Sequence, residues 1–141
     1  MLALLRSSLL LVVLLGMSLH AHADKTGPVP FVMQMTVGDS DAQRRAFLQI
    51  QKVMQDMGPK KVKIEVVAYE GGLTSLLASN NDTATLVAAL ARQGVRFKAC
   101  RISMGAHELK EDAFPLEVEF VPAGAPEMVN LQIKGYRYWR P

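Results

Sequence analysis

The chain has only one cysteine, Cys100, among its 141 residues. A single cysteine cannot form a disulfide within the chain, so no covalent cross-link holds this fold together. Cys100 is therefore a buried and inert side chain, a free thiol with a chemical task, or a link between two chains. Composition alone leaves these three roles open.

Histidine is also scarce, because His107 is the only one of the three histidines that lies beyond residue 23. The sequence gives no pattern that would join this histidine to a serine and an aspartate in a Ser/His/Asp catalytic set. Gly71-Gly72 is too short for a phosphate-binding fingerprint. The densest basic cluster, Lys60-Lys61-x-Lys63, is typical of a solvated turn rather than of a nucleic-acid footprint. We therefore expect no cofactor, no resident metal and no nucleic-acid partner.

The N-terminus has the pattern of a secretory signal peptide. Arg6 supplies a positive charge, Leu9–Leu15 is an unbroken apolar run, and Ala21-His22-Ala23 matches a cleavage site. The apolar run is shorter than the roughly 20 residues that span a membrane. The pattern predicts a signal peptide over residues 1–23, a periplasmic domain over residues 24–141, and no stable membrane anchor after cleavage.

The remaining chain alternates between strand-like and helix-like segments. Strands are predicted at Pro30–Val37, Val62–Tyr69, Val95–Ala99, Leu116–Val121 and Tyr136–Arg140. Helices are predicted at Ala42–Met57, from about 83 to Gln93, within Ser103–Ala113, and from Pro126 to about Lys134. This order predicts an α/β three-layer sandwich, in which a mostly parallel five-stranded sheet has helices on both faces.

The predicted strands carry more charge than a fully buried parallel sheet should. Charged residues alternate along three of them: Lys63 and Glu65, Arg96 and Lys98, and Glu117 and Glu119. We therefore expect each of these strands to have one side that faces solvent or an interface between subunits.

Candidate site residues follow the strands, at the edge where open α/β sheets bind their ligands. Asp39, Glu70-Gly71 and Cys100 each come at or just after the end of a predicted strand. Cys100 also precedes a predicted helix, whose exposed amides and dipole favour an anion and lower the pKa of a thiol. Lys98 and Arg101 add positive charge in the same direction. The alternative is that Cys100 fills space at a strand end, as buried cysteines often do.

Several segments together resemble the DsrE/DsrF/TusD-like sulfur-relay superfamily, in its exported form. The segments that carry the resemblance are Val66-Val67-Ala68-Tyr69 with Gly71, Gly94-Val95-x-Phe97-x-Ala99-Cys100 with Met104, Val121-Pro122-Ala123-Gly124, Glu127-Met128, Leu131-Gln132, and Gly135-Tyr136-x-Tyr138-x-Arg140-Pro141. They extend over nearly all of the chain beyond residue 23.

The resemblance implies a parallel sheet between helices and assembly into trimers or hexamers. In the sulfur-relay members, a cysteine after the third strand accepts sulfur as a persulfide and passes it to a partner protein. Cys100 occupies that position. Exported relatives often have a small polar pair such as Asn-Thr soon after the cysteine, whereas this chain has Ile102-Ser103.

Three functional hypotheses follow. The leading one is a periplasmic sulfur carrier or sulfurtransferase-like protein, in which Cys100 reacts, Lys98 and Arg101 stabilise its anion, and Asp39, Glu70 and Gly71 shape the cleft. The second is a non-catalytic oligomeric binding module with a structural cysteine. The third is a copper binder, because Cys100, Met104 and His107 would share one face of a helix, and sulfur and imidazole ligands suit Cu(I).

Overall fold

The computed structural model describes residues 27–141, which form a five-stranded sheet. The strands are β1 (Val29–Met35), β2 (Val62–Ala68), β3 (Arg96–Cys100), β4 (Val118–Val121) and β5 (Arg137–Trp139). Their order across the sheet is β4-β3-β2-β1-β5, and all four neighbouring pairs are parallel. The predicted signal peptide, residues 1–23, lies outside the described residues.

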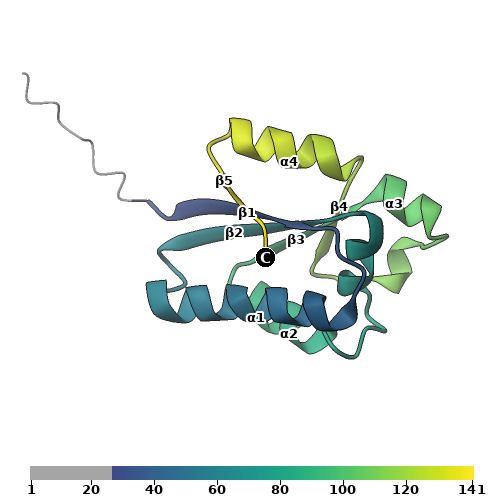
Figure 1. Cartoon of the computed structure of the whole chain (residues 1–141), viewed down its shortest axis with the longest axis horizontal. Coiled ribbons are helices and arrows are strands. Elements are labelled where there is room, and N and C mark those ends of the chain that lie inside the picture. The colour runs from purple at the N-terminus through teal and green to yellow at the C-terminus, as the bar shows by residue number, and fades with distance from the viewer. Residues whose placement is uncertain (1–26) are drawn as a thin grey trace, which may run out of the picture.

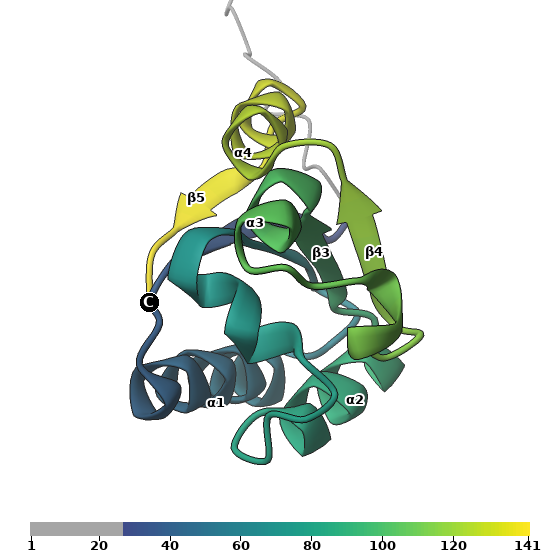
Figure 2. The ribbon, with the colours of Figure 1, turned by 90° about the vertical axis from the view of Figure 1, so that its right-hand side faces the viewer.

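Helices cover both faces of the sheet, as Figures 1 and 2 show. The helical segments are α1 (Ser40–Met57), α2 (Ala84–Arg92), α3 (Arg101–Ala106), α4 (Gly124–Ile133) and two 3₁₀ turns, η1 (Glu70–Leu76) and η2 (Glu111–Ala113). α1 and α2 lie against one face, α4 lies against the other, and α3 lies beyond the carboxyl ends of the strands. The predicted three-layer α/β sandwich is therefore confirmed. Within residues 27–141 no helix is both long and apolar enough to cross a membrane.

α1 illustrates how local sequence sets these elements. Asp39 caps its N-terminus, where the carboxylate accepts the amide of Ala42 at 2.8 Å. Gly58 ends the helix with a φ of 93°, which favours glycine. The buried side of α1 packs on the sheet, where the rings of Phe47 and Phe97 meet edge to face.

The two faces of the sheet bury different kinds of side chain. The main hydrophobic core lies on the face covered by α1 and α2, and includes Phe47, Ile50 and Phe97. A smaller apolar cluster lies on the face covered by α4, and consists of Val32, Val67, Met128 and Leu131. The second face therefore holds less apolar surface and leaves room for charged side chains.

Those charged side chains are the alternating ones seen in the sequence, and the expectation that they face solvent or an interface holds only in part. Glu65 and Lys98 are buried, with 1% and 6% of their surface exposed. Arg96 and Glu119 are partly exposed and pair with each other at 2.7 Å. α4 crosses above this part of the sheet, so the polar side of β2 and β3 is covered by helix.

The third helix is shorter than its predicted region. α3 ends at Ala106, and a separate 3₁₀ turn, η2, begins at Glu111. Glu108 lies between them with a φ of 54°, a left-handed conformation that an α-helix cannot contain. His107 therefore lies beyond the end of α3 and is exposed.

Candidate functional site

Cys100 is placed by the junction of a strand and a helix. It is the last residue of β3 and the N-cap of α3, with the extended φ and ψ of −78° and 119° that such a residue adopts. Its side chain is buried, with 3% of the residue exposed. The thiol therefore lies at the carboxyl edge of the sheet, beside the amides of the next turn and below the surface.

Hydrogen-bond donors from two separate segments surround the sulfur. The amide of Gly124, at the start of α4, donates to Cys100 Sγ at 3.2 Å. The amides of Ile102 and Ser103 and the Ser103 hydroxyl also lie near the sulfur and lower the pKa of the thiol. Burial raises the pKa of the Cys100 thiol, but these donors outweigh it, so the pKa lies below its ordinary value. The arrangement stabilises a thiolate with neutral donors.

The Ser103 hydroxyl is oriented by a neighbouring backbone amide. The amide of Glu70 donates to Ser103 Oγ at 2.8 Å. Because the oxygen accepts this bond, the single hydroxyl proton is available to donate to sulfur. Glu70 holds the required position with a φ of 50°, a conformation that is uncommon outside glycine. The Glu70 amide thus occupies the Ser103 oxygen as an acceptor and leaves its proton free for the neighbouring thiol.

The absence of a side chain at Gly124 brings the second donor close to sulfur. A Cβ at Gly124 would lie 2.7 Å from the ring of Tyr69. Such a contact would force the ring or the loop between β4 and α4 to move. Gly124 therefore lets the chain pack against Tyr69 while its amide reaches Cys100.

The two cations predicted to stabilise the anion are each paired with carboxylates. Lys98 contacts Glu65 at 2.6 Å and also pairs with Glu127. Arg101 is half-exposed, pairs with Glu111, and lies 5.2 Å from the ring centroid of Phe120. The donors that lower the pKa of the thiol are the amides and the Ser103 hydroxyl.

The three residues predicted to shape the cleft have separate roles in the structure. Asp39 caps α1 and lies 4.0 Å from Arg45. The carboxylate of Glu70 is on an exposed residue, and only its amide reaches the sulfur site, through Ser103. Gly71 packs against the backbone of Gly38, and a Cβ there would lie 3.1 Å from Gly38 Cα. Of these three residues, only Glu70 is linked to the surroundings of Cys100, through the hydrogen bond from its amide to Ser103.

The predicted copper ligands are divided by the fold. Met104 is 5% exposed and belongs to the main hydrophobic core. His107 is exposed and lies beyond the end of α3, so a single helical face does not join it to Cys100. Within residues 27–141, no group of three or more His, Cys, Asp or Glu side chains is arranged to hold a metal ion.

Sequence reasoning does not identify Ser103 or Gly124 as site residues. In the sequence, Ser103 stands out only because it departs from the Asn-Thr pair of exported relatives. A hydroxyl three residues after a cysteine at the start of a helix could nevertheless have indicated a donor to the sulfur. Gly124 is 24 residues away from Cys100, and its amide reaches the sulfur because β4 pairs with β3, which places Val121, three residues before Gly124, beside Cys100.

Comparison with known proteins agrees with this fold. The model of the DsrE/DsrF-like family matches residues 30–140. A protein of unknown function from Methanobacterium thermoautotrophicum has a similar structure, with a TM-score of 0.75 and 29% sequence identity over 80% of this chain and 99% of that one. No curated protein matches the sequence. The chain belongs to the DsrE/DsrF-like family, which places it in a sulfur-relay type of superfamily.

Proposed function

We propose that this protein carries sulfane sulfur on Cys100 as a persulfide. The observation that supports the proposal is the set of donors around Cys100 Sγ, above all the Gly124 amide at 3.2 Å and the Ser103 hydroxyl. A thiolate is the nucleophilic form of cysteine, and these donors favour it. Membership of the DsrE/DsrF-like family supports the same chemistry.

The proposed reaction has two balanced steps. The Cys100 thiolate attacks the outer sulfur of a donor persulfide, forms a new S–S bond, and releases the donor as a thiolate. The proton of the donor persulfide stays on the transferred sulfur. In the second step an acceptor thiolate attacks that sulfur and regenerates the Cys100 thiolate. No external oxidant or reductant is consumed, because the sulfur moves at one oxidation level.

The mass of the intact protein after treatment with inorganic polysulfide tests the proposal. We expect the wild-type protein to gain one sulfur atom and to lose it when a small-molecule thiol is added. The Cys100→Ser variant should show neither change. The rate at which iodoacetamide alkylates the untreated protein should increase with pH, with a midpoint below about pH 8.5, the ordinary pKa of a cysteine.

Two serine variants locate the cause of the lowered midpoint. Ser103→Ala removes the side-chain donor to sulfur, so the alkylation midpoint should rise towards its ordinary value. Ser75→Ala is the matched control, because Ser75 is a fully buried serine on η1 and is not a donor to Cys100. Equal midpoints in wild type and Ser103→Ala would contradict the role assigned to the hydroxyl.

The low exposure of Cys100 supports a second candidate, a binding module with a structural cysteine. The same measurements separate the two functions. A thiol that reacts with neither polysulfide nor iodoacetamide until the protein is denatured would reject persulfide carriage and leave the binding module. Reaction in the native state requires local movement of the segment around Gly124, which covers the sulfur.

The signal-peptide pattern supports a periplasmic location for this chemistry, with a sulfur donor or acceptor protein as partner. In such an oxidising compartment a thiol needs protection from disulfide formation. Burial of Cys100 supplies part of that protection. Fractionation of cells that express the full chain tests the location: we expect the protein in the periplasmic fraction and shortened by its first 23 residues.

We also propose that the chain forms a homo-oligomer, a trimer or hexamer, through the outer face of α4. Val129 and Ile133 lie one turn apart on α4 and are 56% and 79% exposed. Val129→Glu with Ile133→Glu should reduce the molar mass measured by light scattering to that of the monomer. Leu116→Glu is the control, since Leu116 is fully exposed but lies before β4. Unchanged mass in the double variant would exclude this face as the contact.

A further inference from the structure

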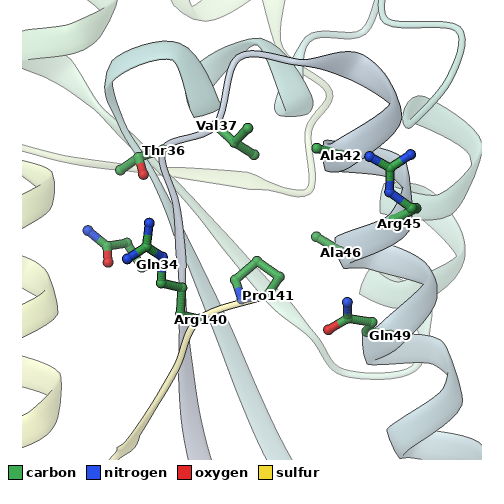
Figure 3. Close-up of a pocket in the computed structure, with 9 residues that line it drawn as sticks. All are labelled: Gln34, Thr36, Val37, Ala42, Arg45, Ala46, Gln49, Arg140 and Pro141. Atoms are coloured by element: carbon green, nitrogen blue, oxygen red, sulfur yellow. The ribbon is translucent and has the colours of Figure 1, made fainter.

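A cavity of about 320 Å³ lies where the strand order of the sheet reverses. Starting from β1, the chain adds β2, β3 and β4 on one side, and then returns to add β5 on the other. Open α/β sheets bind ligands at such a reversal, beyond the carboxyl ends of the strands. This cavity occupies that place, between the ends of β1 and β5 and the side of α1 (Figure 3).

Two arginines from different elements line the cavity. Arg45 extends from α1, and Arg140 follows β5 on the opposite wall, beside Gln34 (Figure 3). Within residues 27–141 Arg140 has no carboxylate partner at ion-pair distance, and Arg45 has only Asp39, at 4.0 Å between two exposed side chains. An ion pair of that kind contributes little. Both arginines thus contribute to the lining of the cavity, Arg140 beside Gln34 and Arg45 on α1, and neither is closely paired with a carboxylate among the described residues (Figure 3).

The other walls suit the uncharged part of a small organic molecule. Gln49 and Thr36 offer an amide and a hydroxyl, and Val37, Ala46 and Pro141 offer apolar surface. A cavity of this volume is at the lower end of the range for small-molecule sites. Guanidinium groups recognise carboxylate and phosphate oxygens through paired hydrogen bonds.

We propose that this cavity binds a small organic anion, which is attracted by Arg45 on the α1 wall and by Arg140 on the β5 wall. The site is separate from the sulfur site: its lining residues come from β1, α1 and the end of β5, whereas Cys100 is bonded to residues of α3 and α4. The inference therefore goes beyond persulfide carriage and does not depend on it.

Calorimetric titration of the full chain with two anions and their neutral analogues tests the site. The probes are succinate against succinamide, and phenyl phosphate against phenol, at constant ionic strength set with sodium chloride. We expect saturable binding of at least one anion and none of either neutral analogue. Binding of succinate alone or of phenyl phosphate alone identifies the group that the site prefers, and supports the proposal in either case.

Arginine variants locate the binding. Arg45→Ala and Arg140→Ala should each weaken binding of the anion about tenfold. This is the effect expected for loss of a charged hydrogen bond. Arg44→Ala is the matched control, because Arg44 is the neighbouring exposed arginine of α1 and does not line the cavity. Cys100→Ser should bind the anion as wild type does. The test of this cavity is therefore independent of the test of persulfide formation on Cys100.

Three outcomes would overturn the proposal. The first is no saturable binding of either anion at millimolar concentration. The second is equal binding of the neutral analogues, which would remove the role of charge. The third is an equal loss in Arg44→Ala and in the two cavity variants, which would show a general surface attraction. Circular dichroism of each variant verifies that the fold is retained.

Discussion

Replacing Gly72 with alanine should destabilise the fold by about 3 kcal/mol or more, the upper range for an overpacked interior. Gly72 lies in η1, where a Cβ would come within 2.0 Å of the Met35 carbonyl oxygen and 2.6 Å of the Thr36 amide nitrogen. Both atoms belong to the backbone at the end of β1, so no side-chain rotation can relieve the contact. The loss is a large fraction of the roughly 5 to 15 kcal/mol that stabilises a typical domain.

The midpoint of urea unfolding measures this effect. Gly105→Ala is the control, because Gly105 lies in α3, has no positive φ, and has nothing within 4 Å of the position that a Cβ would take. Alanine is the better helix former, so this variant should be equal to wild type or up to about 1 kcal/mol more stable. Equal stability of Gly72→Ala and wild type would show that η1 does not pack against β1 as described.

Replacing Lys98 with methionine should cost about 3 kcal/mol at neutral pH, because it leaves the buried Glu65 without its closest cation. Lys98 contacts Glu65 at 2.6 Å and joins it to Glu127 on α4. Arg96 at 3.1 Å and the hydroxyl of Tyr136 at 2.6 Å remain as partners of Glu65, which limits the loss. Lys63→Met is the control: Lys63 is half-exposed and 4.0 Å from Glu65, so its loss should cost less than about 1 kcal/mol.

The pH dependence of the free energy of unfolding tests whether Lys98 acts through its ion pair with Glu65. Burial raises the pKa of Glu65, but bonds from Lys98 and Tyr136 outweigh it and leave the pKa lowered. Its contribution to stability is therefore present above the unfolded pKa, about 4.3, and is lost as pH falls through the folded value. Burial lowers the pKa of Lys98, and bonds from Glu127 and Glu65 outweigh that effect and raise it.

The Lys98 contribution is accordingly complete below about 10.4 and is lost as pH rises through the folded value. The difference in stability between wild type and Lys98→Met should be largest near neutrality and shrink in acid, where Glu65 is protonated in both proteins. A difference that stays constant down to pH values well below about 4 would show that Lys98 acts through packing alone.

Local signals in the sequence are sufficient to predict the architecture. Alternating segments, the Asp39 cap and the stops at Gly58 and Gly94 each act within a few residues of the chain. The parallel direction of the strands then follows from the helix that connects each strand to the next. The strand-to-helix junction at Cys100 is predictable for the same reason, because it depends only on where β3 ends.

The surroundings of Cys100 and Glu65 depend on contacts between distant segments, and the sequence alone does not supply them. Glu65 pairs across the sheet with Arg96 by strand register, is buried, and is joined through Lys98 to Glu127 on α4. Gly124 reaches the sulfur because β4, which ends three residues before it, pairs with β3. The sequence therefore predicts that the charged strand residues face solvent or an interface, whereas α4 covers two of them.

The position of Gly124 and Glu127 on one short helix links two parts of the protein. Gly124 donates to the sulfur from the first residue of α4, and Glu127 is held to the sheet by Lys98 one turn later. A molecule that lifted this helix would withdraw the amide from the thiolate and expose the sulfur in one movement. The pKa of the thiol and its accessibility would then increase together, so α4 couples these two properties of Cys100.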